Sequence, residues 1–271
     1  MICSKNFITN LLKKNKIFPK ERFGQNFLVS RKALDKITNC IGSGELVIEI
    51  GAGLGVLTEK LAKRFKKIIA LEIDREIFPL LQENLNKFSH IDFNLQDALQ
   101  YRPPVRDYIL CGNIPYNISS PLIRRFLFEV ENIPQKIVFL VQKEFGEKIC
   151  QKKNSLIKIL ITSFAQVKIR GNIKKNNFFP PPKIDSVVIE IIPHSNPCIP
   201  FAKWQNFFFL LEAGFGERRK LLVSNLAKNS TISKEEVQEI FLKLDIPPKA
   251  RAEDLENEDW FALYNWMNNE R

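Results

Sequence analysis

The stretch ELVIEIGAGLGVLTEKL, residues 45–61, decides how this chain folds. It begins with a short apolar run, ELVIEIG, which is typical of a buried β-strand, and it ends in an amphipathic segment with helical spacing. Three glycines, Gly51, Gly53 and Gly55, stand between the two. Because glycine permits tight turns and close approach to the main chain, the stretch predicts a strand, a ligand-binding loop and a helix.

Strand-like and helix-like segments alternate on both sides of this stretch. A helix is expected at 30–41, with Ser30 as its N-cap. Parallel strands need crossover helices, so the alternation predicts an α/β fold whose mostly parallel sheet carries helices on both faces. The further strands are expected at 66–74, 91–99, 107–114 and 135–144, and the helices between them at 75–88 and 119–130.

The pattern changes in the last third of the chain. A proline-rich loop leads into an apolar strand within 178–194 without an obvious crossover helix, which suits an antiparallel strand at the end of the sheet. A linker at 195–200 follows, and after it we expect helices at 201–215, 217–228, 233–244 and 258–267. The predicted parts are a basic N-terminal arm (1–22), a ligand-binding α/β domain (23–195) and a small all-helical domain (196–271).

Charge and composition limit the classes of function. The chain has 271 residues, a formal net charge of +11 and a pI of about 9.4. This surplus favours a polyanionic partner, either nucleic acid or an anionic membrane, although a generally lysine-rich composition would also produce it. No apolar run reaches about 18 residues, which argues against a membrane span, and the N-terminus lacks the features of a signal peptide.

The cysteines and histidines indicate neither a disulfide framework nor a metal site. The two histidines stand at no ligand spacing, and no C-x-x-C pair is present. We therefore expect reduced cysteines in a cytoplasmic protein that binds no metal. We also expect the protein to be a monomer that does not associate with a membrane. The residues concerned are Cys3, Cys40, Cys111, Cys150, Cys198, His90 and His194.

The glycine spacing discriminates between nucleotide-binding loops. In the dinucleotide fingerprint the third glycine falls three residues after the second, but here that position is Val56. The spacing argues against NAD, and a phosphate loop of the G-x-x-x-x-G-K-[ST] type is also absent.

Two carboxylates follow the next two predicted strands. Glu72 ends the second strand, where it can accept hydrogen bonds from both hydroxyls of a ribose. Asp97 ends the third strand and can accept one from an adenine amino group. Each acid alone could be a solvated surface carboxylate. Together with Gly51 and Gly53, they predict a site for an adenosine-containing cofactor at one edge of the sheet.

A second motif, CGNIPYNISSP at residues 111–121, follows the fourth strand. It combines Asn113, Pro115 and Tyr116 without a His, Cys, Lys or paired carboxylate beside them. The E-x-G-x-G-x-G loop with its two acids resembles the class I, Rossmann-like S-adenosylmethionine-dependent methyltransferases. NIPY resembles the signature of those members that act on an amino nitrogen conjugated to a ring or carbonyl. The resemblance implies S-adenosylmethionine as the cofactor, with Asn113 in contact with it.

The chemistry of such a nitrogen explains why no catalytic base is needed. Adenine N6 is a poor nucleophile because its lone pair is delocalised into the ring, but its proton can leave after the attack. It needs hydrogen-bond acceptors, and the Asn113 Oδ1 and the Ile114 carbonyl can serve. Pro115 would aim that carbonyl, and Tyr116 would stack on the base. The other interpretation of NIPY is an ordinary strand-ending turn with a packed tyrosine.

Two further stretches resemble one family, the bacterial small-subunit (16S) rRNA adenine N6,N6-dimethyltransferases. FGQNFLVS, residues 23–30, resembles the N-terminal cofactor-edge motif of this family, which implies cofactor contacts for Asn26 and Leu28. FFPPPKIDSVV, residues 178–188, resembles the proline-rich loop beside the target base, which makes Phe179 a candidate for the second stacking face.

The C-terminal part extends this resemblance to the rRNA-binding subdomain of the family, through AGFGERRKLLVSNL (213–226) and IPPKARAEDL (246–255). Arg218, Arg219 and Lys220 fit phosphate contacts, and a solvated helix face is the alternative. The resemblance implies that the partner is 16S rRNA within a small-subunit precursor. It also implies that the product is N6,N6-dimethyladenosine at two adjacent adenosines in a hairpin loop near the 3′ end.

Three alternatives remain at this point. The related 23S rRNA adenine N6-methyltransferases of the macrolide-resistance type share the glycine loop and NIPYNIS, but the two C-terminal stretches look like the small-subunit enzymes. Protein-glutamine and DNA-adenine methyltransferases usually carry a second proline where Ile114 stands. A non-enzymatic ribosome-assembly factor is disfavoured by the intact set of Glu72, Asp97 and Asn113.

Overall fold

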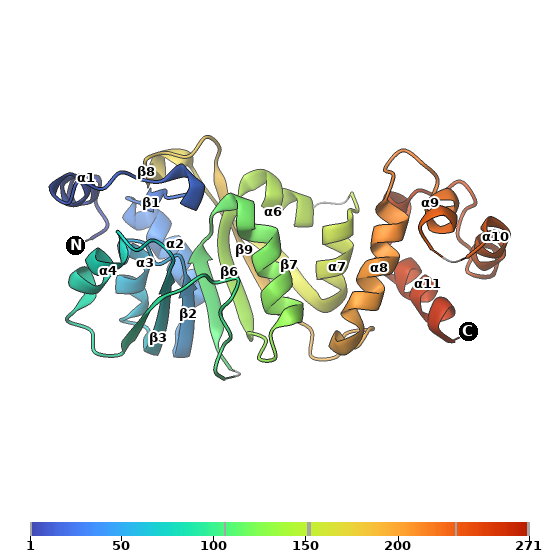
Figure 1. Ribbon diagram of the computed structural model, residues 1–271, viewed down its shortest axis with the longest axis horizontal. Coiled ribbons are helices and arrows are strands. Elements are labelled where there is room, and N and C mark those ends of the chain that lie inside the picture. The colour runs from blue at the N-terminus through green and yellow to red at the C-terminus, as the bar shows by residue number, and fades with distance from the viewer. Residues whose placement is uncertain (1, 106, 151–152, 231, 270–271) are drawn as a thin grey trace. The chain divides into compact units, whose positions relative to one another are not determined.

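The structure is a computed structural model that describes residues 2–105, 107–150, 153–230 and 232–269. The chain divides into two compact units, which Figure 1 shows. Unit 1 comprises residues 1–146 and 168–193, and unit 2 comprises residues 147–167 and 194–271. The division lies close to the predicted boundary near residue 196, but it also assigns 147–167 to the second unit. Within this unit Asn154 Nδ2 donates to Leu255 O at 2.8 Å, a hydrogen bond that joins Asn154 to the C-terminal part of the chain.

A seven-stranded sheet forms the centre of unit 1 (Figure 1). Its strands are β2 (Gly44–Ile50), β3 (Phe65–Glu72), β4 (Ile91–Leu95), β5 (Ile109–Asn113), β6 (Lys136–Gln142), β7 (Ala165–Ile173) and β9 (Ser186–Pro193). The order across the sheet is β4-β3-β2-β5-β6-β9-β7. The first five in this order are parallel neighbours, and β9 is antiparallel to β6. The predicted α/β class, the parallel strands and the antiparallel direction of β9 are confirmed. The predicted place of this strand at the end of the sheet is wrong, because β7 lies outside β9 and forms the edge.

Strand β7 is an element that the sequence did not predict. It lies at the edge of the sheet, and most of its residues are exposed or half-buried, including Lys168 and Arg170. Edge strands often carry such charges because they discourage pairing with other chains. The segment therefore lacks the apolar run that marks the central strands.

The strand order reverses direction next to β2. From β2 the chain proceeds outward to β3 and β4, and then returns to place β5 on the other side of β2. In open α/β sheets, ligands bind at such a switch point, outside the carboxyl ends of the strands. The glycine loop after β2 and Asn113 at the end of β5 both lie at this edge.

Helices cover both faces of the sheet, with α2 and α3 on one face and α5 on the other (Figure 1). The N-cap of α2 is confirmed, because the Ser30 Oγ accepts a hydrogen bond from Ala33 N at 3.4 Å. The helical elements from the N-terminus to residue 150 are α1 (Lys5–Lys14), η1 (Glu21–Phe23), α2 (Arg31–Ile41), α3 (Val56–Leu61), α4 (Phe78–Leu85), η2 (Tyr116–Ile118), α5 (Ser119–Arg124), the π-helical turn η3 (Arg125–Glu129) and α6 (Lys143–Cys150). A further 3-10 turn, η4 (Lys175–Asn177), follows β7.

The N-terminal residues pack on unit 1. Helix α1 buries Ile8 and Leu12 in the main hydrophobic core. After it, a two-stranded antiparallel sheet joins β1 (Phe27–Leu28) to β8 (Phe178–Phe179). The predicted cofactor-edge motif and the predicted proline-rich loop thus meet by strand pairing.

Apart from the first residues of β7, the described residues of unit 2 form helices and the segments between them. Its elements are α7 (Leu156–Phe164), η5 (Phe201–Lys203), α8 (Trp204–Phe215), α9 (Leu222–Asn229), α10 (Lys234–Lys243), η6 (Ala252–Asp254) and α11 (Asn257–Asn269). Trp260 is completely buried, and its ring stacks on Phe215 with centroids 5.5 Å apart. Helix α9 begins at Leu222, whereas the sequence predicted a helix from residue 217. The reason is that residues 216–220 form a turn, in which Lys220 N donates to Glu217 O.

Candidate functional site

The loop after β2 turns at its three glycines. Gly51, Gly53 and Gly55 have φ angles of 69°, 57° and 86°, in the left-handed region that favours glycine. Gly51 N donates to Leu71 O at 2.9 Å, which ties the loop to the end of β3. A Cβ on Gly55 would lie 2.7 Å from Leu85 Cδ1. Gly55 therefore permits close packing on α4, while Gly51 and Gly53 line a cavity.

Glu72, at the end of β3, is buried and closely held. Its Oε2 accepts a hydrogen bond from Gly53 N at 2.7 Å, and its Oε1 accepts from Ile73 N and Asp74 N at 2.8 and 2.9 Å. Burial raises the pKa of Glu72, and these backbone hydrogen bonds oppose the rise. A carboxylate offers about four lone-pair sites. Three are occupied, which leaves room for about one ribose hydroxyl rather than the two expected from the sequence.

Two further acids border the same cavity. Asp97 is half-buried, and its Oδ1 accepts a hydrogen bond from Leu99 N at 2.9 Å. Glu49 is 1% exposed, and among the described residues its Oε2 has no hydrogen-bond partner. Burial raises the pKa of Glu49 to about 8, and the Glu72 carboxylate adds to this rise.

The cavity brings the predicted cofactor residues together. It is lined by all seven of them, Asn26, Leu28, Gly51, Gly53, Glu72, Asp97 and Asn113. Glu49 lines it as well, and no Lys, Arg or His is found among the described residues of its lining. In a chain with a net charge of +11, this is an acidic site. It suits a ligand that carries hydrogen-bond donors and positive charge, and it disfavours one that carries phosphates.

Asn113 is oriented by the N-terminal segment. Its Nδ2 donates to the main-chain oxygen of Asn26 at 2.8 Å. An amide group presents its oxygen on the side opposite to its nitrogen, so this bond settles which way the side chain faces. The Oδ1 is left as an acceptor, with no donor bound to it among the described residues.

The residues after Asn113 are placed differently. Pro115 lines the cavity, whereas Ile114 does not, and the Ile114 side chain is 2% exposed. Ile114 N donates to Leu140 O at 3.1 Å, which continues the pairing of β5 with β6. The acceptor role of the Ile114 carbonyl therefore stays a prediction. The Tyr116 side chain lies outside the described residues, and its stacking role stays a prediction too.

A second cavity, of about 610 Å³, adjoins the first through shared lining residues. Gly24, Gln25 and Asn26 line both cavities. Its other lining residues include Asn117, Gln142 and the prolines of the loop after β8, Pro180, Pro181 and Pro182. Phe179 is not among them. It is half-buried against the hydrophobic core, and the Lys5 ammonium lies 6.0 Å from the centre of its ring.

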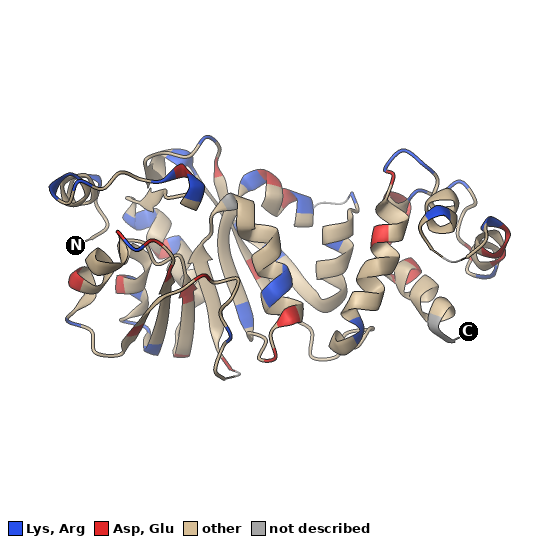
Figure 2. Ribbon diagram, viewed as in Figure 1, with Lys and Arg blue, Asp and Glu red and all other residues tan. Residues whose placement is uncertain are grey.

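The predicted RNA-contacting cations lie in unit 2, in the turn between α8 and α9. Arg218, Arg219 and Lys220 are all exposed there, and Figure 2 shows this turn in the colour of Lys and Arg. Lys220 forms an ion pair with Glu217 at 2.9 Å. Because the three precede α9, they occupy a turn rather than the helix that the sequence predicted over 217–228.

Several residues of the site escaped the sequence interpretation. The sequence pattern indicated no role for Glu49 beyond the glycine motif, yet its side chain is buried and lines the cavity. Gly24 has a φ of 58°, and a Cβ on it would lie 2.9 Å from Pro115 Cβ. Gln25 and Asp74 join the N-terminal segment to the end of β3. The glycine in FGQNF, Gly24, could have signalled the close approach to Pro115. The hydrogen bond between Gln25 and Asp74 depends on how distant segments pair in the folded chain.

Two kinds of feature are absent from the described part of the chain. In it no helix is both long and apolar enough to cross a membrane. The same residues contain no group of three or more His, Cys, Asp or Glu side chains that could hold a metal ion.

Comparison with known protein families shows which family the chain belongs to. A model of the family described as "Ribosomal RNA adenine dimethylase" matches residues 18–269. The chain belongs to this family. A curated member, ribosomal RNA small subunit methyltransferase A of Caldanaerobacter subterraneus subsp. tengcongensis, is 33% identical over 260 residues, which cover 91% of this chain and 96% of that protein.

Two solved structures have the same fold. A dimethyladenosine transferase from Plasmodium falciparum matches with a TM-score of 0.77 and 26% identity, and covers 89% of this chain and 97% of that one. The 23S rRNA methyltransferase ErmE matches with a TM-score of 0.73 and 22% identity, and covers 90% and 100%. At this identity the second likeness shows the fold alone.

Proposed function

We propose that the chain transfers methyl groups from S-adenosylmethionine to N6 of two adjacent adenosines near the 3′ end of 16S rRNA, within a small-subunit precursor. Membership of the ribosomal RNA adenine dimethylase family makes it an rRNA adenine dimethyltransferase. The finer assignment to the small subunit is supported by the names of relatives that are 31–34% identical. The product would be N6,N6-dimethyladenosine.

The cofactor cavity has the chemistry that S-adenosylmethionine requires. The cofactor carries a positively charged sulfur, amino groups and ribose hydroxyls, and no phosphate. Glu72 and Asp97 offer hydrogen-bond acceptors, Glu49 adds a further carboxyl group, and no cation lies among the described lining residues. Glu72 would accept a ribose hydroxyl, Asp97 the adenine amino group, and Gly51 and Gly53 would allow close approach to the main chain. When bound, the cofactor supplies a methyl group that is already activated.

One observation carries the proposed chemistry, namely the orientation of Asn113. Since its Nδ2 is engaged by Asn26 O, the Oδ1 can accept a hydrogen bond from N6 of the target adenine. As N6 attacks, positive charge develops on it, and a hydrogen bond to that charge contributes about 1.5–3 kcal/mol. Holding N6 about 3 Å from the methyl group can supply ~7–11 kcal/mol. Positioning therefore outweighs the acceptor, and no strong base is needed.

The second cavity is the proposed site of the target base. It shares Asn26 with the cofactor cavity and is bordered by Gln142 and by the proline loop. Its volume of about 610 Å³ lies in the usual range for small-molecule sites. A base in a hairpin loop costs less to extrude than one in a duplex, which agrees with a loop target. Tyr116 remains a proposed stacking residue. Phe179 stays a proposal for the second stacking face, although it does not line this cavity.

The turn before α9 is the proposed phosphate contact of unit 2. Arg218 and Arg219 are exposed there, and exposed cations bind the RNA backbone without reading its sequence. We also propose a cytoplasmic, monomeric and metal-free enzyme. All five cysteines are free thiols, which supports a reducing compartment.

A comparison of three substrates tests the proposed target. The protein is incubated with cofactor labelled in its methyl group and with unmethylated small subunits, large-subunit RNA or DNA. We expect label only in the small-subunit rRNA. Label in large-subunit RNA would favour the 23S alternative, and no label in any substrate, while small subunits still bind, would favour a non-enzymatic assembly factor.

A further inference from the structure

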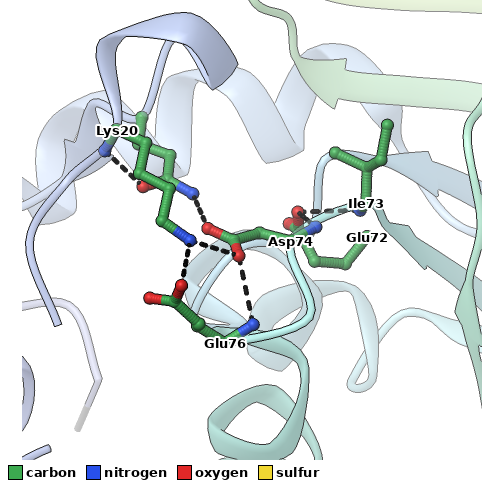
Figure 3. A network of polar contacts seen from close by, with 6 residues as sticks. Lys20, Glu72, Ile73, Asp74 and Glu76 are labelled. Atoms are coloured by element: carbon green, nitrogen blue, oxygen red, sulfur yellow. Dashed lines mark hydrogen bonds and ion pairs between the residues drawn. The ribbon is translucent and has the colours of Figure 1, made fainter.

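One wall of the cofactor cavity is formed by the N-terminal segment, through residues 23–28. We call residues 20–26 the strap. Beyond the strap, β1 is held by its pairing with β8. The start of the strap has no strand partner among the described residues, so other contacts must hold it. Figure 3 shows these contacts, which join the strap to the loop after β3.

Asp74 is the centre of these contacts. Its side chain is 2% exposed, and its Oδ1 accepts hydrogen bonds from Lys20 Nζ at 2.8 Å and from Glu76 N at 3.1 Å. Its Oδ2 accepts a hydrogen bond from Gln25 Nε2 at 2.6 Å. Lys20 Nζ also lies 2.8 Å from Glu76 Oε1. The Lys20 hydrogen bond helps to lower the pKa of Asp74 against the effect of its burial. Asp74 is therefore an anion that binds two side chains of the strap.

The Gln25 amide is fixed at both ends. Its Oε1 accepts a hydrogen bond from the main-chain N–H of Lys20 at 2.7 Å, so its Nε2 must face Asp74. Lys20 and Gln25 thereby hold each other as well as Asp74. Two strap residues that are five positions apart are locked to one carboxylate, which restricts the backbone between them.

This arrangement reaches both halves of the reaction site. Towards the cofactor, Asp74 N donates to Glu72 Oε1 at 2.9 Å. Towards the substrate, Gln25 precedes Asn26, whose main-chain oxygen accepts the Asn113 hydrogen bond. The position of Asp74 is thus linked through the strap to the direction in which Asn113 presents its Oδ1.

We propose that Asp74 is a positioning residue, which together with Lys20 and Gln25 closes the strap over the cofactor and aligns Asn113 for methyl transfer. This inference rests on the proposed function, since it assigns the residues that assemble the same site. Asp74 lines neither of the two cavities. It acts through Gln25 on the strap and through its own main chain on Glu72.

The test compares Asp74→Asn, Lys20→Met and Lys20→Arg with the wild-type protein. Cofactor affinity is measured by calorimetry with S-adenosylhomocysteine, which needs no RNA and no turnover. Steady-state methylation of small subunits gives kcat and the KM for the cofactor, and thermal melting shows whether each variant is folded. The matched control is the exposed ion pair of Lys66 and Glu45, whose nitrogen and oxygen lie 2.7 Å apart with both side chains at least 75% exposed.

We expect Asp74→Asn and Lys20→Met to weaken S-adenosylhomocysteine binding at least tenfold and to lower kcat at saturating cofactor. Lys20→Arg should restore both, because an arginine can also bridge Asp74 and Glu76. Lys66→Met and Glu45→Gln should change neither. Asp74→Asn and Lys20→Met could instead lower the melting temperature and leave affinity and kcat unchanged at temperatures where the variants are folded. That result would overturn the positioning role and leave only a structural one.

The design separates this inference from the proposed function. If the wild-type protein binds S-adenosylhomocysteine but methylates no small subunit, the proposed target is wrong, and the affinity series still tests whether Asp74 closes the strap. If the wild-type protein methylates small subunits and Asp74→Asn matches it in affinity and kcat, the proposed function stands and the positioning role of Asp74 is wrong.

Discussion

The side-chain amide of Asn113 donates a hydrogen bond to the main-chain oxygen of Asn26 at 2.8 Å, across 87 positions of sequence. The two residues come from different elements, one from the end of β5 and the other from the segment before β1. Because both also line the proposed cofactor cavity, the bond joins one wall of that cavity to the orientation of the proposed catalytic acceptor.

Replacing Asn113 tests this orientation directly. Asn113→Asp keeps the shape of the side chain but removes the N–H groups, so a carboxylate oxygen would face Asn26 O and be repelled. We expect both Asn113→Asp and Asn113→Ala to lower kcat by about 100-fold or more, with RNA affinity unchanged. Single-turnover methylation and a filter-binding assay measure the two quantities. Turnover at the wild-type level in Asn113→Ala would remove Asn113 from the chemistry.

Glu72→Gln tests the proposed ribose contact. The glutamine would turn an N–H donor toward the backbone N–H groups of Gly53 or Ile73 and leave one of them without an acceptor, which costs roughly 1–3 kcal/mol. We expect at least a tenfold loss of S-adenosylhomocysteine affinity by calorimetry. The small-subunit affinity should stay at its wild-type value. Equal cofactor affinities of variant and wild type would argue against the ribose contact.

Glu49 predicts a pH dependence of stability in the absence of cofactor. Its pKa is raised from 4.5 to about 8 in the folded protein, so the folded state holds its proton more tightly than the unfolded state. The contribution of this proton to the free energy of unfolding is fully present below pH 4.5 and is lost as the pH rises through 8. Wild-type protein should therefore lose stability relative to Glu49→Gln between pH 6 and pH 9, by several degrees in melting temperature.

Melting curves of the two proteins at matched pH values check this effect, because all other titrating groups are shared. A melting-temperature difference that stays constant from pH 6 to pH 9 would show that Glu49 is ionised in the folded state throughout. The pKa of this carboxyl would then not be raised.

Gly24→Ala tests the close contact between the N-terminal segment and the NIPY motif. The new Cβ would lie 2.9 Å from Pro115 Cβ, at a φ of 58° that alanine rarely adopts. We expect a destabilisation of about 1–3 kcal/mol together with weaker cofactor binding. Gly42→Ala is the matched control, since its φ is also positive at 91° but its Cβ would meet only Lys136 Nζ at 3.8 Å. Weaker cofactor binding in both variants would show that backbone strain alone weakens it, and that the contact of Gly24 with Pro115 is not the cause.

Reversing the charge at Arg218 and Arg219 tests the proposed RNA contact. The double variant to Glu should lower small-subunit affinity and reduce the slope of its salt dependence by about one for each phosphate that the variant no longer binds. Lys234→Glu is the control, because Lys234 is exposed in the same unit at the start of α10. A salt slope equal to that of the control would place Arg218 and Arg219 outside the interface.

The sequence predicted the central strands because each is an apolar run that ends in a polar or glycine residue. It also predicted that Gly51, Glu72, Asp97 and Asn113 share one edge, because parallel strands point their carboxyl ends the same way. It missed β7, whose alternating charges belong to an edge strand.

The contacts between distant segments were beyond the sequence patterns. Asp74 follows Glu72 in an ordinary loop, and only the folded chain brings Gln25 to it. Likewise, the turn that holds Arg218 and Arg219 was predicted as helix, because the local spacing does not reveal where α9 begins.

Mass mapping of the product tests the central claim most directly. Unmethylated small subunits are incubated with the protein and S-adenosylmethionine, and the rRNA is digested and analysed by mass spectrometry. The account predicts N6,N6-dimethyladenosine at two adjacent adenosines near the 3′ end of 16S rRNA, formed about 100-fold more slowly or slower still with Asn113→Ala. Methyl groups confined to large-subunit RNA, or dimethyladenosine formed equally by Asn113→Ala, would contradict it.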